Sequence, residues 1–415
     1  MLTAVPLTAP PPIHPHPTYK TDIAIVGAGI VGATLACALK DSGLSIALIE
    51  AQPQDQAASK RQAYALTLLS GKIFDRLGVW QEILPQIVTF DHIQISDANQ
   101  WVVDLTPEDL GTDHLGYVGE HGVILTALQR QINQSPQIEW VCPAQVQEVR
   151  YFEDFAQVWV NSAEHPEPIV IESRLVVATD GSKSAIRQAA AISTQGWRYW
   201  QSCVATTIKT EKPHNNVAFE RFWYTGPMGV LPLPGNRVQV VWTAPHEQAQ
   251  ALQKLDEAEF LRRLEYRTAG ILGRLELAGP RFVFPVQLMQ CDRYVDHRLA
   301  LAGDAAHCCH PVGGQGLNLG IRDAAALAEV IQACHRQHQD IGQLKNLKPY
   351  QQWRKPENWM ILGFTDFLDR TFSTDWLPVV WIRRLGLLFL QKFAIGRTLS
   401  LRLMTGLMGR TPEVN

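Results

Sequence analysis

Short apolar runs without alternating polar positions predict a buried parallel sheet in this chain. A strand that helices cover on both faces is apolar along its whole length, because neither face meets water. Four runs have this character, at residues 23–26, 45–49, 175–178 and 298–302. A helical stretch over residues 31–39 follows the first run, and another over 316–333 follows the last. The pattern predicts an α/β fold.

A second pattern, in which apolar and polar residues alternate, predicts half-buried strands. It occurs at residues 92–96, 199–209 and 237–243. A period of two is typical of strands with one face on a core. Because these segments lie between pieces of the first pattern, we expect them to form a mostly antiparallel sheet inserted into the α/β domain.

The first apolar run leads into the glycine motif GAGIVG at residues 27–32. Gly27 allows a tight turn, Gly29 lets a pyrophosphate approach the backbone, and Gly32 lets the helix pack on the sheet. Glu50 ends the second run, where a carboxylate accepts hydrogen bonds from ribose hydroxyls. Since a carboxylate repels a 2′-phosphate, the sequence predicts tightly bound FAD or NAD rather than NADP.

Two further motifs follow other predicted strands of the parallel sheet. Asp180 and Gly181 come after the run at 175–178, although Asp-Gly is by itself a common turn. Gly303 and Asp304 come after the last run, and we expect Asp304 to accept a hydrogen bond from a ribityl hydroxyl. The helix that begins at Gly316 directs its N-terminus toward the same place, where it would favour negative charge on a reduced flavin. Together the three motifs predict one dinucleotide held at three places.

With these motifs the chain resembles the flavin-dependent aromatic hydroxylases with a single FAD-binding fold, and among them the ubiquinone-biosynthesis monooxygenases. The run 303–323 (GDAAHCCHPVGGQGLNLGIRD) and the segment 218–222 (AFERF) are similar to signatures of the quinone-pathway subgroup. The resemblance covers residues 21–409, and one departure is Thr179, where alanine is more usual. It implies that FAD is bound by Gly27, Gly29, Gly32, Glu50, Asp180, Gly181, Gly303, Asp304 and Gly316.

The resemblance implies hydroxylation of a prenylated phenol in quinone biosynthesis. NADPH or NADH reduces FAD, oxygen adds to give a C4a-hydroperoxyflavin, and the phenol ring attacks that oxygen. The chain has no second GxGxxG motif, so the nicotinamide is expected to bind transiently. Two alternatives stay open: a flavoprotein that does not activate oxygen, such as a carotenoid or isoprenoid cyclase, saturase or dehydrogenase, and a protein that only binds a prenyl chain or a partner.

Further site residues are assigned from their place in the motifs. Pro311, Gly313, Gly314 and Gln315 are expected to pass close to the flavin ring. Arg61 either contacts an FAD phosphate or is a solvated surface residue. Four apolar residues are candidates either for the aromatic cavity or for plain core: Phe222, Trp223, Met228 and Leu231.

These assignments predict a discontinuous domain organisation. Residues 1–19 hold six prolines and no charged side chain, so we expect a flexible leader. The FAD-binding domain is expected over 20–85, 121–190 and 281–345, and the substrate domain over 86–120 and 191–280. Residues 346–415 are expected to form carboxyl-terminal helices.

Composition narrows the remaining classes. A net charge of −3 argues against nucleic-acid binding, and seven cysteines without a CxxC motif indicate reduced thiols in the cytoplasm. The stretch 307–310 (HCCH) is too crowded to place four ligands around one zinc, so we predict no metal site. Whether the chain forms a homo-oligomer or joins a quinone-biosynthesis complex stays open.

The segment 376–411 carries no acidic residue and six basic ones between apolar positions. It holds no uncharged run long enough to span a bilayer. Basic amphipathic helices can lie on anionic membranes, so we expect peripheral membrane contact here. The alternative is that these helices pack on the flavin domain with basic tips in solvent.

Overall fold

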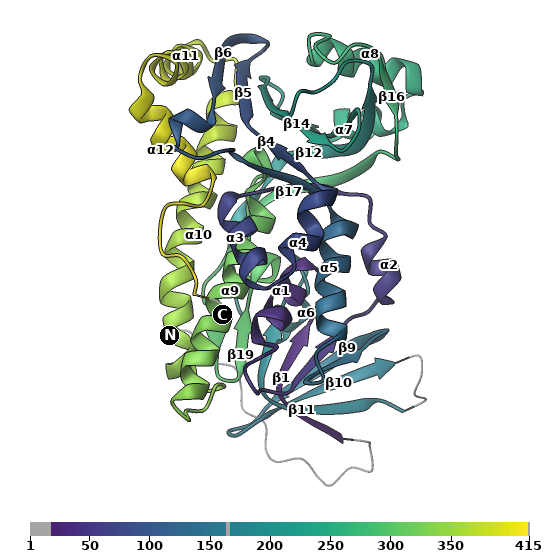
Figure 1. Ribbon diagram of the computed structural model, residues 1–415, viewed down its shortest axis with the longest axis vertical. Coiled ribbons are helices and arrows are strands. Elements are labelled where there is room, and N and C mark those ends of the chain that lie inside the picture. The colour runs from purple at the N-terminus through teal and green to yellow at the C-terminus, as the bar shows by residue number, and fades with distance from the viewer. Residues whose placement is uncertain (1–17, 163–166, 414–415) are drawn as a thin grey trace.

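The computed structural model describes residues 18–162 and 167–413. The predicted leader, residues 1–19, lies outside them except for its last two residues, which begin β1. In this part of the chain two large sheets lie one above the other, with the long helix α10 alongside both (Figure 1).

The lower sheet has a parallel core built from the predicted apolar runs. Its strand order is β18-β19-β11-β1-β2-β8, with β10 and β9 attached to β11, and strands β19 to β8 run parallel. β1 lies between β11 and β2, so the chain leaves it toward one side and returns on the other. The bounds are β1 Thr18–Val26, β2 Ile46–Ile49, β8 Ile138–Val141, β9 Ala144–Tyr151, β10 Ala156–Ser162, β11 Ile169–Ala178, β18 Val295–Asp296 and β19 Leu299–Leu301.

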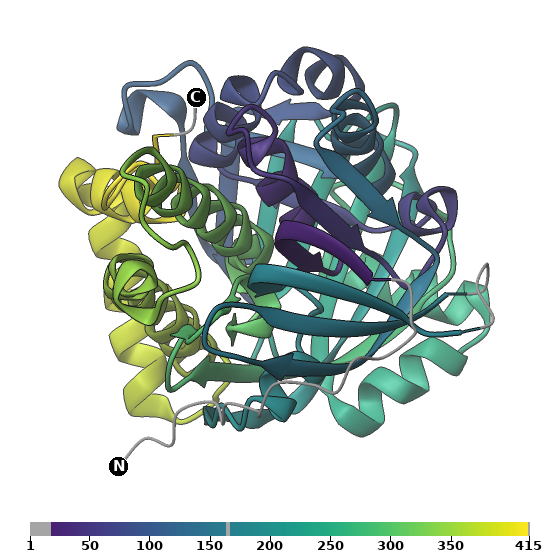
Figure 2. The same ribbon diagram turned by 90° about the horizontal axis from the view of Figure 1, so that it is seen from below.

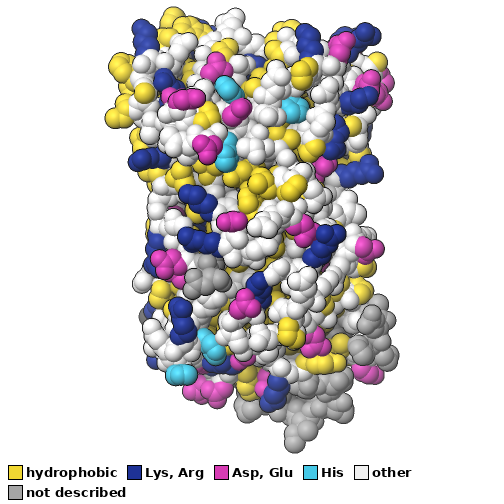
Figure 3. Space-filling model, viewed as in Figure 1, with side chains coloured by type: hydrophobic (Ala, Val, Ile, Leu, Met, Phe, Trp, Pro, Cys, Tyr) yellow, Lys and Arg dark blue, Asp and Glu magenta, His cyan; other side chains and the backbone are white. Residues whose placement is uncertain are grey.

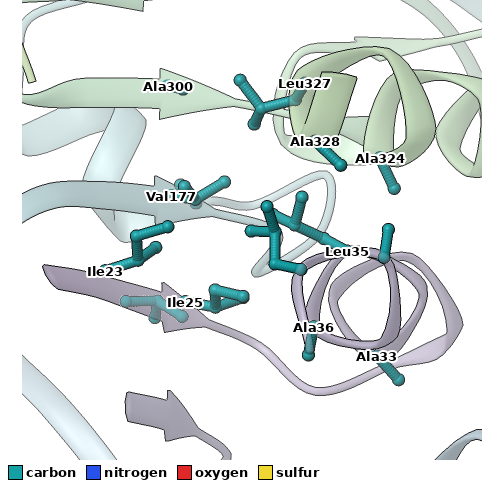
Figure 4. Packing of buried hydrophobic residues seen from close by; sticks show 14 of the residues in the cluster. Ile23, Ile25, Ala33, Leu35, Ala36, Val177, Ala300, Ala324, Leu327 and Ala328 are labelled. Atoms are coloured by element: carbon teal, nitrogen blue, oxygen red, sulfur yellow. The ribbon is translucent and has the colours of Figure 1, made fainter. Parts of the chain in front are cut away.

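Two helices cover this sheet at the first glycine motif. They are α1, Ile30–Leu39, and α9, Gln315–Arg336. Figure 4 shows Leu35 of α1 and Leu327 of α9 pointing toward the side chains of the strands. Gly320 lets the helices approach, because a Cβ added there would lie 2.6 Å from a methyl carbon of Val31.

The upper sheet is antiparallel except where β13 pairs with β5. Its order is β20-β17-β12-β15-β14-β13-β5-β6, and β16 pairs with β12. We expected residues 281–345 to belong to the FAD-binding domain, but β17 and β20 hydrogen bond into this upper sheet. The bounds are β5 His92–Asp97, β6 Gln100–Leu105, β12 Thr194–Thr210, β13 Val217–Phe222, β14 Met228–Leu233, β15 Arg237–Pro245, β16 Leu275–Leu277, β17 Phe282–Cys291 and β20 His307–Cys308.

Smaller elements connect the two halves. A three-stranded antiparallel sheet has the order β3-β7-β4, with β3 at Ala63–Leu66, β4 at Val88–Phe90 and β7 at Gly116–Glu120. The short helices are α2 Gln54–Ala58, α3 Leu68–Arg76, α4 Trp80–Ile83, α5 His121–Asn133, α6 Ala185–Ala189, α7 His246–Lys254 and α8 Glu257–Arg267.

The carboxyl-terminal helices gather on one side of the molecule in both ribbon views (Figures 1 and 2). They are α10 Leu344–Phe372, α11 Leu377–Lys392 and α12 Ala394–Met404. α11 is fixed to β5 by a buried ion pair in which the Arg383 guanidinium donates to both oxygens of Asp97, at 3.0 and 2.9 Å. No helix in the described part of the chain is both long and apolar enough to cross a bilayer. The predicted fold class, an α/β domain with an inserted antiparallel sheet and a helical carboxyl-terminal segment, is confirmed.

Candidate cofactor and substrate site

The first glycine motif turns at the carboxyl end of β1, beside the end of β11. Gly27 has φ +98°, and a Cβ there would lie 2.7 Å from the carbonyl oxygen of Thr179. A Cβ on Gly32 would lie 1.9 Å from the carbonyl oxygen of Gly27. Both positions therefore require glycine, the first for its conformation and the second for the close packing of α1 on the turn.

Gly29 and Glu50 differ from these two glycines. Gly29 leaves space for a ligand, and Glu50 carries a carboxylate that can accept further hydrogen bonds. An added Cβ on Gly29 would meet no atom within 4 Å, and Gly29 lines a cavity. The Glu50 carboxylate accepts hydrogen bonds from the backbone N–H groups of Ala28, at 2.8 Å, and Gln52, at 3.0 Å. These bonds fix the carboxylate against the glycine turn, where the predicted ribose contact requires it.

Thr179, the one departure from the family pattern, stabilises the same turn. Its hydroxyl lies 2.6 Å from the carbonyl oxygen of Gly27 and 2.9 Å from that of Val26, and it donates its single proton between them. The backbone N–H of Thr179 also donates to the Val26 carbonyl, at 2.8 Å. An alanine would lack the side-chain bond, so the threonine adds a tie between the ends of β1 and β11.

Asp180 and Gly181 follow directly at the end of β11. Asp180 accepts a long hydrogen bond, 3.5 Å, from the Ile186 N–H through one carboxylate oxygen. Its other oxygen is buried and has no partner among the described residues. Gly181 has φ +84° and lines the cavity. A buried carboxylate oxygen without a donor is costly, and a ligand hydroxyl would satisfy it.

The third motif, Gly303 and Asp304, is anchored to the buried carboxylate of Asp323. Gly303, at φ +60°, donates its N–H to Asp323 of α9 at 3.1 Å. Asp304 turns its accessible surface toward the cavity. Enclosure by the protein raises the pKa of Asp304, and the nearby His307 opposes that shift.

Sequence reasoning assigned no role to Asp323, although it ends the signature run 303–323. The other oxygen of Asp323 accepts from Arg354, at 2.8 Å, and from Asn358, at 3.0 Å. His307 Nε2 lies 2.5 Å from the oxygen that also serves Gly303. Burial acts to raise the pKa of Asp323, but His307 and Arg354 outweigh it and lower the pKa to about 2. Removing one member of such a buried charged network costs about 3–5 kcal/mol.

The loop at 311–316 passes between the cavity and the carboxyl-terminal helices. Gly313 and Gly314 both have left-handed conformations, with φ +71° and +62°, and both line the cavity together with Pro311 and Gly316. Gln315 does not line it. Its side-chain amide donates to the carbonyl oxygens of Gly313 and Met404, each at 3.0 Å, so it ties the loop to α12.

One cavity of about 830 Å³ joins all three motifs. Gly29, Gly181 and Asp304 line its lower end, the upper sheet forms its roof, and α10, α11 and α12 close one side. The open approach to Gly29 and the unpartnered oxygen of Asp180 fit the phosphates and hydroxyls of a dinucleotide. The residues present therefore fit FAD.

The structure brings two of the four predicted substrate residues to this cavity. Phe222 and Leu231 line it, and the Phe222 ring stacks on Phe372 of α10 at a centroid distance of 3.8 Å. Met228 lies three residues before Leu231 on β14. Because residues an odd number apart on a strand point to opposite faces, Met228 faces away from the cavity and packs in the core. Trp223 lies outside the cavity lining, against the Arg267 guanidinium.

Arg61 is exposed, directly before Gln62, which lines the cavity. Its side chain makes no hydrogen bond or ion pair with another residue of the described ranges 18–162 and 167–413. Both interpretations of Arg61 therefore stay predictions. Sequence reasoning also missed Glu220 and the helix residues of the cavity wall. Glu220 belongs to the segment 218–222 that resembles the quinone-pathway signature. It lies two residues from the predicted cavity residue Phe222, and on a strand such residues share a face, which was the signal that could have found it.

The two glycines 29 and 32 offer a matched test of the site. Gly29→Ala adds a methyl group that meets no protein atom, so the apoprotein keeps its thermal unfolding temperature while FAD binds about tenfold or more weakly, a loss of about 1.4 kcal/mol. Gly32→Ala overpacks the turn and lowers apoprotein stability by about 1–3 kcal/mol. Thermal unfolding and flavin titration of both apoproteins measure this. Unchanged FAD affinity in Gly29→Ala would contradict the placement of the pyrophosphate.

Comparison with known proteins agrees with this geometry. The family described as FAD binding domain matches residues 20–365. An uncharacterized protein of Synechocystis sp. is 53% identical over 95% of each chain. The protein named ubiquinone hydroxylase UbiL of Rhodospirillum rubrum is 33% identical and covers 98% of this chain and 95% of its own.

A solved structure shares the fold at low identity. The p-nitrophenol 4-monooxygenase PnpA of Pseudomonas putida superposes with a TM-score of 0.81 at 20% identity, covering 95% of this chain and 99% of its own. FAD is therefore the cofactor of this family, and its contact with the glycine motifs stays a prediction. The chain belongs to the FAD binding domain family, and within it to the FAD-dependent aromatic hydroxylases of the ubiquinone-biosynthesis monooxygenase type.

Proposed function

We propose that this enzyme uses NAD(P)H and O2 to hydroxylate the aromatic ring of a prenylated phenol in quinone biosynthesis. The observation that carries this proposal is the continuous cavity, which joins the FAD motifs to an apolar end at the carboxyl-terminal helices. A relative that is 33% identical over nearly the whole chain is named a ubiquinone hydroxylase, which supports a substrate of this class.

The lining of the cavity matches an amphipathic substrate. Polar groups of Glu220, Gln239 and Thr243 lie on the roof, while the side wall consists of apolar residues of α10 and α11: Phe364, Phe367, Leu368, Ile382, Phe389 and Leu390. A phenol ring at the roof and a prenyl chain along the helices would bury both parts against matching surfaces.

When bound, FAD accepts a hydride from the nicotinamide and activates oxygen. The chain itself contributes orientation and water exclusion. The loop at 311–314 lines the cofactor end of the cavity, and the mainly apolar roof and helices keep water from the reacting ring. The stacked rings of Phe222 and Phe372 join β13 to α10, so the roof and the side wall hold one shape around the substrate.

The reaction predicts a substrate-stimulated nicotinamide oxidation. With the FAD-loaded enzyme in air, a short-chain prenylphenol increases the rate of NADH or NADPH oxidation, and a hydroxylated product forms. Phenol without a prenyl chain is the control and requires a higher concentration, because it does not fill the apolar end. Absence of stimulation with either nicotinamide across several prenylphenols would favour a flavoprotein that does not activate oxygen.

The same proposal includes contact with a membrane through a carboxyl-terminal apolar face. This face consists of exposed apolar side chains on α10, α11, α12 and the turn before α11: Phe367, Trp376, Leu377, Trp381, Ile382, Leu385, Phe389, Phe393, Ile395 and Leu399. Several project at the upper left of Figure 3, over the helices labelled α11 and α12 in Figure 1. So large an exposed apolar area is typical of an interaction surface.

Two observations favour an anionic lipid surface as the occupant. Phe367, Ile382 and Phe389 belong both to this face and to the cavity lining, so the apolar end of the cavity reaches the face. Exposed Lys392 and Arg402 border it, and residues 376–411 contain no acidic side chain. A lipid-borne substrate would then pass from the bilayer into the cavity along apolar surface.

Exchanging two central residues of the face tests this contact. The double variant Trp381→Gln, Leu385→Gln is expected to lose at least about tenfold in binding to vesicles of anionic phospholipid, measured by sedimentation. Tyr266→Ser, on exposed α8, is the matched control and keeps wild-type binding. Equal binding by both variants would contradict the proposal, and so would a wild-type dimer that the double variant converts to a monomer, since the face would then be a subunit interface.

A further inference from the structure

Glu220 stands out because it is the acidic side chain that the roof sheet presents to the cavity. On β13 the residues Ala218, Glu220 and Phe222 face the cavity, while Arg221 faces away and donates to Ser96 and Gln94, at 2.8 and 2.7 Å. The neighbouring strands continue this cavity face with Ile95 of β5 and Gly229 of β14, which pair with Glu220 in the ladder. The carboxyl group therefore lies on a mainly apolar wall.

The carboxyl group of Glu220 is connected to the loop at the cofactor end. The backbone N–H of Gly313 lies near the carboxyl group and favours its charged form. Gly229 leaves space beside it, since a Cβ there would lie 3.8 Å from one carboxylate oxygen. Glu220 thus meets the cavity at the point where the roof sheet approaches the loop that lines the cofactor end, with free volume next to the carboxylate.

Among the described residues, no oppositely charged side chain pairs with this group. Burial raises the pKa of Glu220 to about 7, and only the Gly313 N–H acts in the opposite direction. The other titratable or charged side chains that line the cavity are Tyr64, His121, Asp304, Cys308, Cys309 and Arg383. Behind the roof, Glu220 and Asp369 both act on the Cys203 thiol. Arg383 pairs with Asp97, and burial raises the pKa of the Cys203 thiol to about 12.

We propose that Glu220 is the catalytic base that takes the proton from the ring hydroxyl of the phenol. This assignment rests on the proposed hydroxylation. The O–H bond of the phenol breaks, its electron pair stays on the ring oxygen, and the proton forms a new O–H bond on the Glu220 carboxylate. The resulting phenolate is richer in electrons at the ring carbon that receives the oxygen atom.

The proton returns when the ring becomes aromatic again. The carbon that has gained the hydroxyl group then loses its hydrogen as a proton to water, and the ring oxygen takes back the proton from Glu220. The carboxylate is regenerated without a further reactant. A carboxyl group whose pKa is raised to about 7 is a stronger base than an ordinary glutamate and can still give the proton back at the end of the cycle.

Glu220→Gln tests the base while it keeps the contact to Gly313. The amide has nearly the same size and keeps an oxygen near the Gly313 N–H, so FAD content and thermal stability are expected to stay at wild-type values. For the prenylphenol, kcat/KM of the wild type is expected to rise with pH through about 7, as the carboxylate forms. In Glu220→Gln this rise is absent and kcat/KM falls by about 10²-fold or more. Glu220→Asp, which keeps a carboxylate, restores part of the activity and the pH dependence.

A measurement without turnover separates this proposal from the proposed function. The near-ultraviolet difference spectrum of the prenylphenol bound to oxidised, FAD-loaded enzyme reports whether the phenol is ionised. The prenylphenol for this measurement carries electron-withdrawing ring substituents that bring its hydroxyl pKa near 7, close to that of Glu220. Wild type is expected to bind a larger fraction of it as the phenolate at neutral pH than Glu220→Gln does. Gly229→Ala, which narrows the space beside the carboxylate but keeps it, is the control and retains the phenolate spectrum.

The outcomes lead to different conclusions. Equal ionisation of the bound phenol in wild type and Glu220→Gln would overturn the assignment of Glu220 while leaving the hydroxylase in place. A wild type that neither binds nor hydroxylates prenylphenols would overturn the proposed function, and the base with it.

Discussion

The arrangement of the site depends on one buried carboxylate, Asp323. It binds the N–H of Gly303 at the third motif, the His307 ring, and Arg354 and Asn358 of α10. Because Asp323 lies on α9 and its partners come from two other segments, the cofactor loop, α9 and α10 are held as one unit. α10 then continues to Phe372, which stacks on the roof. The same helix thus determines both the cofactor end and the side wall of the cavity.

The polarity of the cavity follows from this construction. Its lower end is made of strand ends and glycine turns, where Asp304 lines the cavity and Asp180 lies next to the lining residues Thr179 and Gly181. Its far end is made of helices whose apolar side chains face both the cavity and the outside. An enzyme with a polar cofactor and a lipid-like substrate needs both ends, and Glu220 lies on the roof between them.

Local spacing was enough to predict the nucleotide half of the fold. The glycine motif, the strand before it and Glu50 lie within one βαβ unit, so their geometry follows from short-range rules. Side-chain direction on the roof required strand register, which sequence did not supply: Met228 and Leu231 look alike in sequence but face opposite sides of β14. The side wall of the cavity could not be predicted from local spacing. Its position depends on the ion pair between Asp97 and Arg383, which lie far apart in the sequence and fix α11 to β5.

We propose that this flavoenzyme inserts an oxygen atom from O2 into a prenylated phenol. The most direct measurement is mass spectrometry of the product formed under ¹⁸O2 by the FAD-loaded enzyme with NAD(P)H and a short-chain prenylphenol. The account predicts a product that carries one labelled oxygen atom on the ring. A product whose new oxygen comes from water, or an oxidised product with no new oxygen, would contradict it.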